Sequence, residues 1–210
     1  MLRLLLIPMV ALTLMFGAAI GSIRAQLDDT AYRQSLRDFL LPPQGCAAPC
    51  WQGIRPDEST LTEALDLLES RGWSGGVNFQ RGMAMDTGLL LVQWSGQQPS
   101  FINSQRPAIF WIEANVVKRM SIALNIPYGA AWLSLSTPEQ GAVSIGSVSP
   151  PILSHYAAST ADDFVLYSGM SCPLTPQRLW DARIELLLGM TDEFDLSDYD
   201  LASWLHDPLC

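Results

Sequence analysis

The chain has 210 residues, of which 12 are Lys or Arg and 21 are Asp or Glu, so its formal net charge at pH 7 is −9. Nucleic acids and anionic membrane surfaces attract proteins through basic patches, and this balance argues against both as partners. The length is sufficient for one domain with a sizeable hydrophobic core, or for two small related halves.

The first 25 residues have the layout of an export signal. Arg3 supplies a positive charge ahead of an apolar run over residues 4–20, and small residues follow. This run is longer than most signal cores and nearly long enough to span a bilayer, so residues 1–25 form either a cleaved signal peptide or an uncleaved membrane anchor. In both cases we expect residues 26–210 to be extracytoplasmic: secreted, periplasmic, or held to the outer face of the membrane by residues 4–20.

The chain contains four cysteines: Cys46, Cys50, Cys172 and Cys210. In an oxidising compartment an even number is most simply explained by two disulfides. We favour Cys46 with Cys50, because cysteines four apart in a tight turn can reach bonding distance, and Cys172 with Cys210, which would hold the C-terminus.

The alternative for Cys46 and Cys50 is a thiol-redox or copper-binding pair. A Cys-x-x-x-Cys motif with a remote histidine resembles the copper-binding loop of Sco-type thioredoxin-fold proteins. The resemblance implies a thioredoxin-like strand before the loop and a proline after it, whereas here Trp51 follows Cys50.

Two amphipathic helices are expected first in chain order. The first begins near Asp29 or Thr30 and ends before Pro42-Pro43, with one apolar face formed by Tyr32, Leu36, Phe39 and Leu40. The second begins at the capping box Thr60-x-x-Glu63 and ends near Gly72, with an apolar stripe formed by Leu61, Ala64, Leu65 and Leu68.

From Gly75 onward the apolar period shifts towards two, which is typical of strands. We expect strands around Val77 and Phe79 and over residues 89–94, 108–113, 116–124, 142–145, 152–157, 164–167 and 183–188. Ala114-Asn115 is a plausible hairpin turn, since Asn tolerates positive φ. A short helix is expected over residues 130–135, and Ser197-x-x-Asp200 is a cap ahead of Leu201, Trp204 and Leu205. The pattern favours an α+β fold, an antiparallel sheet with helices packed on one face.

The turn Gly53-Ile54-x-Pro56 with its capped helix and following meander resembles the small extracytoplasmic repeat of BamE/SmpA lipoproteins, which occurs in tandem in β-lactamase inhibitor proteins. About 25 residues carry this resemblance, and Asn125-Ile126-Pro127 before a short helix gives a loose second copy. The resemblance implies two tandem halves, residues 26–125 and 126–210, and a non-enzymatic domain that binds another protein or an envelope component through its sheet face. The BamE group has a lipidated cysteine near its N-terminus, whereas the first cysteine here is Cys46.

A second resemblance covers residues 46 to about 190. Pro49-Cys50-Trp51-x-Gly53-Ile54-x-Pro56 and Leu179-Trp180-Asp181-Ala182-Arg183-Ile184-Glu185-Leu186 are similar to motifs of uncharacterised exported bacterial proteins. This family brings no activity that could be transferred to the chain.

Catalytic and metal motifs are weak. The chain has two histidines, His155 and His206, but lacks the Gly-x-Ser-x-Gly motif that carries the nucleophilic serine of a Ser-His-Asp hydrolase. We expect His155 to lie in the core or at its rim, and His206 to lie at the end of a helix. The acidic run over residues 192–200 indicates a solvated loop with a helix cap, with a weak calcium site as the alternative. No phosphate-binding loop or zinc pattern is present, so we expect no cofactor and no metal.

Seven tryptophans are many for this length, and aromatic side chains are enriched both in cores and at interfaces. Trp94 and Trp111 lie on neighbouring predicted strands and could share one face. An exposed face would make them the candidate binding surface, and core packing is the alternative. We therefore expect an exported non-catalytic component of the cell envelope, with another envelope protein or a glycan as its partner.

Overall fold

The computed structural model describes residues 30–82, 86–135, 137–146 and 151–206. The predicted signal or anchor, residues 1–25, lies outside the described residues. The chain divides into two compact units, residues 1–35 and 36–210, and within the first only the start of one helix is described. In the part of the chain that the structure describes, no helix is both long and apolar enough to cross a membrane.

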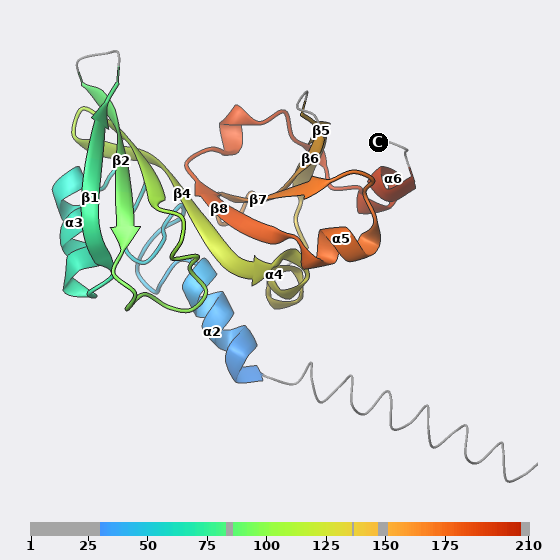
Figure 1. Cartoon of the computed structure of the whole chain (residues 1–210), viewed down its shortest axis with the longest axis horizontal. Helices are drawn as coiled ribbons and strands as arrows, with labels where there is room; N and C mark the ends of the chain where they lie inside the picture. Colours follow the sequence, from blue (N-terminus) through green and yellow to red (C-terminus); the bar gives the residue numbers. More distant parts are fainter. Residues whose placement is uncertain (1–29, 83–85, 136, 147–150, 207–210) are drawn as a thin grey trace, which may run out of the picture. The chain divides into compact units, whose positions relative to one another are not determined.

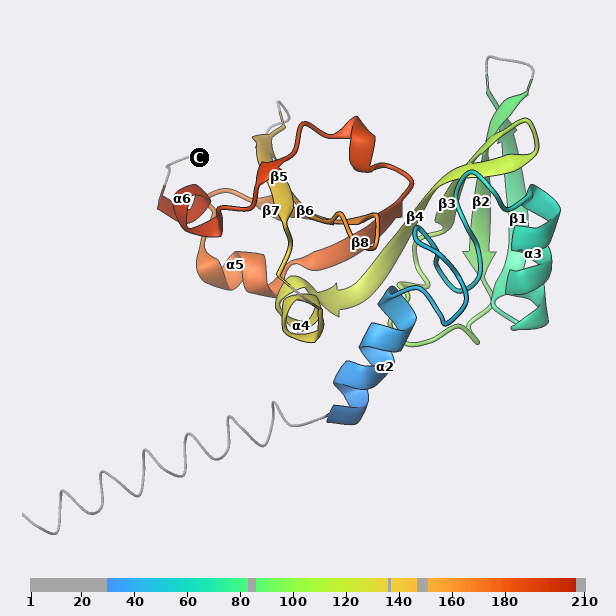
Figure 2. The same cartoon turned by 180° about the vertical axis from the view of Figure 1, so that it is seen from behind.

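The elements are, in chain order, α2 (Thr30–Leu40), α3 (Leu61–Ser70), β1 (Ser74–Arg81), β2 (Thr87–Trp94), β3 (Ala108–Glu113), β4 (Val116–Pro127), α4 (Tyr128–Ser134), β5 (Gln140–Ile145), β6 (Ile152–Ser159), β7 (Phe164–Ser171), α5 (Pro176–Asp181), β8 (Arg183–Leu188), the 3₁₀ turn η1 (Thr191–Glu193), β9 (Ser197–Asp198) and α6 (Leu201–His206). The described strands form one antiparallel sheet in the order β1-β2-β3-β4-β8-β7-β6-β5-β9. α3 lies near the β1 end of this sheet and α6 near the β5 end (Figures 1 and 2). The structure is therefore of the expected α+β class, with the sheet as its dominant part.

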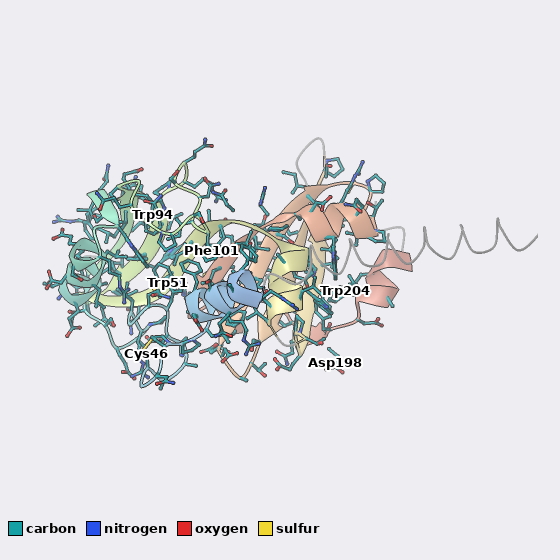
Figure 3. The ribbon with its side chains drawn as sticks, turned by 90° about the horizontal axis from the view of Figure 1, so that it is seen from below. Cys46, Trp51, Trp94, Phe101, Asp198 and Trp204 are labelled. Atoms are coloured by element: carbon teal, nitrogen blue, oxygen red, sulfur yellow. A yellow bond between two sulfur atoms is a disulfide. The ribbon has the colours of Figure 1, made fainter. Side chains whose placement is uncertain are left out.

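A disulfide joins Cys46 and Cys50 in the segment between α2 and α3. The next residue, Trp51, is fully buried, and its ring lies 5.7 Å from that of Phe39 and 6.0 Å from that of Trp73 (Figure 3). Its backbone closes a two-residue turn with Ile54 through two hydrogen bonds of 3.0 and 2.9 Å. The disulfide loop is thus fixed to the core through Trp51.

The capping box predicted for α3 is present. The Oγ1 of Thr60 accepts a hydrogen bond from the N–H of Glu63, whose carboxylate accepts one from the N–H of Thr60. Gly72, at φ +69°, follows the helix in the left-handed conformation that glycine adopts easily. Because Thr60 also bridges to Val116, the start of α3 is held against β4.

The turn between β3 and β4 is the one that the sequence predicts. Ala114 and Asn115 both have positive φ, 48° and 65°, as a two-residue hairpin turn requires. β4 then continues without interruption to Pro127. The boundary expected between residues 125 and 126 therefore falls inside a strand.

One face of the sheet and the helices enclose a continuous hydrophobic core. Helices α2, α3, α4 and α5 contribute buried residues such as Leu36, Ala64, Ala131 and Leu179 to the same cluster as the strands. Burial of apolar surface of this kind is the main favourable contribution to folding. The helices therefore pack on one face of the sheet, as expected.

Helix α5 and strand β9, near the C-terminus, were not expected from the sequence. Helix α5 begins after Thr175, whose Oγ1 accepts from the N–H of Arg178 at 3.3 Å. Strand β9 occupies two residues and pairs with β5, so Ser197 lies in a strand and not in a helix cap. Asp200 caps α6 alone, accepting from the N–H of Ser203 at 3.0 Å.

We expect Thr60→Ala to lower the free energy of unfolding by about 1 kcal/mol, because the backbone N–H of Glu63 loses its acceptor and the Glu63 carboxylate loses its hydrogen bond from the hydroxyl. Thr60→Ser keeps the hydroxyl and should stay close to the parent chain. Urea titration of both variants under non-reducing conditions measures the difference. Equal stability of the Ala and Ser variants would show that the cap contributes nothing.

Candidate functional site

The second face of the sheet is defined by the register of β2, β3 and β4. Leu90 and Val92 of β2 are buried in the core, so the alternating residues Leu89 and Leu91 point to the opposite side. Residues directly opposite each other in an antiparallel pair share a face. Trp111 lies opposite Leu89 and Ile109 lies opposite Leu91.

We call this side of β2–β4 the uncovered face, consisting of Leu89, Leu91, Ile109, Trp111, Arg119, Ser121 and Ala123. The first four side chains are half-buried, and no described α-helix packs on them. Contiguous half-exposed apolar side chains of this kind mark interaction sites more often than isolated ones do.

Trp111 lines a hollow of about 550 Å³ at one end of the uncovered face. Leu89 and Gly88 of β2 form part of its wall. Glu113, Asp192 and Glu193 also line the hollow and make its rim partly acidic. An indole beside charged groups offers both a large apolar contact area and polar contacts at its edge.

The basic residues of this hollow are held in ion pairs. Nζ of Lys118 lies 2.7 Å from Oδ1 of Asp57, and Arg119 pairs with Glu193. The hydrogen bond and the charge of Asp57 raise the pKa of Lys118, and the charge of Glu113 adds to this. These exposed pairs contribute little stability, but they fix the position of the charges around Trp111.

The segment of residues 190–196, which contains η1, covers part of the same sheet side over β6–β8. Met190, Phe194 and Leu196 pack on the buried side chains of Val165 and Leu187. The ring of Phe194 lies 4.5 Å from that of Tyr156. Among the described residues, the open part of this side therefore lies over β1–β4, with a second hollow farther along the sheet.

The second hollow has a volume of about 540 Å³ and lies over β4, β8 and β7. Glu185 is one of the residues that line it, and its side chain is only 13% exposed. It pairs with Arg106 at 2.8 Å and accepts a hydrogen bond from Ser121. Tyr167 lies opposite Glu185 in the register and lines the same hollow.

Trp94 and Trp111 do not share a face, which corrects the candidate binding surface expected from the sequence. Trp94 is 9% exposed, belongs to the core cluster, and donates from Nε1 to the carbonyl of Arg106 at 2.9 Å. Trp94 lies an odd number of residues along β2 from Leu89, so these two side chains point to opposite faces of the sheet. Trp111 lies opposite Leu89 and shares its face. Only Trp111 reaches the uncovered face.

The three cysteines among the described residues are bonded. Cys50 is 1% exposed and bonded to Cys46, and Cys172 is also in a disulfide. Its expected partner, Cys210, lies outside the described residues. While the Cys46–Cys50 bond is intact, neither sulfur is available as a thiolate nucleophile or copper ligand.

His155 lies in the core, at the centre of a hydrogen-bonded chain. Its Nδ1 is 3.2 Å from Oγ of Ser168 and its Nε2 is 2.9 Å from the hydroxyl of Tyr199. That hydroxyl is in turn 2.6 Å from the hydroxyl of Tyr128. These hydrogen bonds join His155 of β6 and Ser168 of β7 to Tyr199 in the C-terminal segment.

Burial controls the protonation of this network. It lowers the pKa of His155 to about 4, and it raises the pKa of Tyr199 to about 12. The pKa of Tyr128 is also raised, first by burial and then by its contact with Tyr199. All three groups are neutral at pH 7. Because Ser168 is fully buried, a substrate cannot reach the Ser168–His155 pair, and the network serves to attach the C-terminal segment.

The acidic residues of the run 192–200 lie in different elements and make different contacts. Glu193 pairs with Arg119, Asp198 lies in β9, and Asp200 caps α6. No group of three or more His, Cys, Asp or Glu side chains that could hold a metal ion occurs among the described residues. The side chain of His206 lies outside the described part.

The chain matches no family model, no curated protein and no solved structure. The site around Trp111 is completed by three residues that were not predicted from the sequence: Leu89, Leu91 and Ile109. Their strands were predicted, but the pairing register that unites them was not. The function is accordingly inferred from the chemistry of the uncovered face.

We expect the free energy of unfolding to fall as the pH decreases from about 6.5 to about 4. In this range the unfolded chain binds a proton at His155, whose ordinary pKa is 6.5, while the folded chain does not. The contribution of His155 to this loss is on the order of 3 kcal/mol and is nearly complete at about pH 4. Urea titrations at several pH values in this range measure the free energy of unfolding. It should depend less on pH in His155→Gln than in the parent chain, and an equal pH dependence would contradict the assignment.

We also expect Cys46 and Cys50 to remain unlabelled when the native protein is alkylated without reduction and its peptides are mapped by mass spectrometry. The buried, bonded Cys50 carries no reactive thiol. Label on both cysteines, or a copper adduct in the native mass spectrum, would instead support the thiol or copper hypothesis.

Proposed function

We propose that the protein is an exported, non-catalytic binding domain that holds another protein of the cell envelope against the uncovered face. The observation that carries this proposal is the group of half-buried apolar side chains around Trp111, with no described helix over it. The export signal expected over residues 1–25 and the Cys46–Cys50 disulfide support an oxidising, extracytoplasmic location.

The make-up of the uncovered face matches that of a protein interface. Interface centres are enriched in aromatic residues and Arg, and their rims are polar. Here Trp111 lies between Leu89 and Arg119 in one row across the sheet, and the pairs Lys118–Asp57 and Arg119–Glu193 border the hollow. A partner that covers Trp111 would remove a large apolar area from water without leaving these charges unpaired.

The strand order supports the tandem interpretation as part of this proposal. Strands β1–β4 and β5–β8 each form a four-stranded antiparallel group, and β4 pairs with β8 where the groups meet. Each group follows a helix, α3 and α4 respectively. We infer two related halves, as in the β-lactamase-inhibitor-like arrangement, that share the strand junction near Pro127.

A photo-crosslinking amino acid placed at Leu91 should capture a defined protein in the native envelope, because Leu91 is a half-exposed residue of the uncovered face and lies opposite Ile109 of β3. The matched control is Leu133 of α4, which is 51% exposed and lies on the helix side. We expect an adduct from position 91, none of the same mass from position 133, and its loss on Trp111→Ala. An aromatic side chain at the centre of an interface contributes about 2 kcal/mol or more, roughly a 30-fold change in Kd.

Two results would contradict the proposal. Equal adducts from positions 91 and 133 would indicate random collision, and a Trp111→Ala variant that keeps the adduct would place the interface elsewhere. Capture of a glycan and no protein would show that the partner is a glycan and not a protein.

A further inference from the structure

Among the described strands, β1 forms one edge of the sheet and pairs with β2 only. Seven of its eight residues are exposed. An unpaired strand edge presents a row of backbone N–H and C=O groups that can extend the sheet with another strand. β1 is therefore a place where the fold could be continued.

Two large apolar side chains stand exposed on this edge strand. Val77 is 49% exposed and Phe79 is 48% exposed, and both lie on the helix side of the sheet, opposite Val92 and Leu90. The ring of Phe79 rests over Gly88, where a Cβ would collide with it. Phe79 is thus held in place on one side, while its other side is open to solvent.

The common protections of an edge strand are few in β1. Proteins block edges with Lys, Pro, inward-pointing charges, bulges or very short strands. The sequence of β1, Ser-Gly-Gly-Val-Asn-Phe-Gln-Arg, contains no Lys, no Pro and no acidic residue. Its one bulge lies at the start, between Ser74 and Gly76, and leaves the rest regular. At the other edge of the sheet, by contrast, β9 has two residues.

We propose that β1 pairs antiparallel with β1 of a second copy of this chain, centred on Asn78. This register places Val77 opposite the partner's Phe79, and Phe79 opposite the partner's Val77. The two exposed apolar pairs then lie on the helix side of one continuous sheet, and the amides of Asn78 and Gln80 lie on the other side. The proposal is independent of the function proposed for the uncovered face.

The neighbouring registers fit less well. Centring on Val77 would place Phe79 opposite Gly75 and leave its ring without an apolar partner. Centring on Phe79 would place Arg81 opposite Val77, so that a charge meets an apolar side chain. Only the register centred on Asn78 gives each exposed apolar residue an apolar partner, and it places Arg81 opposite Gly75, with no like charges facing each other.

The net charge of the chain should make dimer formation depend on the salt concentration. Each copy carries −9 at pH 7, so two copies repel each other over long distances, although β1 itself contains no acidic residue. Salt screens this repulsion. Dimer formation should therefore increase as the ionic strength rises from low to moderate values.

The test is disulfide formation between copies of the full-length chain under mild oxidation. Asn78→Cys should give a cross-linked dimer, because directly opposite residues have Cα atoms about 4.5 or 5.5 Å apart, within the range that a disulfide spans. Gln80→Cys, the matched control, lies on the same side of β1. In the proposed register its two copies are four residues apart along the strand, about 13 Å, and should not cross-link.

A second variant tests the apolar pairs. Val77→Lys with Phe79→Lys would place four like charges against one another, and because both side chains are exposed we expect the fold to persist. Light scattering of the purified full-length chain should show a concentration-dependent dimer for the parent and a monomer for this variant. Cross-linking of Gln80→Cys equal to that of Asn78→Cys, a parent that stays monomeric, or capture of a different protein at residue 78 would overturn the proposal.

Discussion

The pairing of β4 with β8 is the contact on which the rest of the fold depends. Met120 lies opposite Leu188 and Ile122 opposite Leu186, all on the core side. Without these pairs the strands would form two separate sheets, each with another open edge and a smaller core. With them, the helices close one continuous core, and the opposite side becomes one surface that contains Trp111, Glu185 and both hollows.

Much of the local structure could be predicted from the sequence, because its signals act over a few residues. The Thr60–Glu63 capping box, the stop at Gly72 and the Ala114-Asn115 turn each depend on the chemistry of adjacent groups, and all are present. Helix α5 carried a comparable signal in Thr175-Pro176, a cap followed by proline at the first helical position. Residue 179, read as part of a motif, is in fact a buried position of this helix.

The candidate site could not be predicted, since it depends on which residues face each other. β2 reads as a nearly continuous apolar run, so the sequence does not show whether Leu89 or Leu90 points to the core. For the same reason the faces of Trp94 and Trp111 could not be assigned, because their relation depends on a register set by the whole sheet. The contact of His155 with Tyr199 spans 44 residues, beyond any local signal.

The strand order also determines how the molecule can be assembled. β4 ends at residue 127, whereas β8 begins only at residue 183, after two intervening helices and three further strands. A chain that grows from its N-terminus therefore carries β4 as an open edge until most of the chain has been made, and pairs so distant in sequence form slowly. The centre of the finished sheet is consequently the part that forms late, and a folding factor acting on the nascent chain would have to shield β4, an interior strand of the native fold.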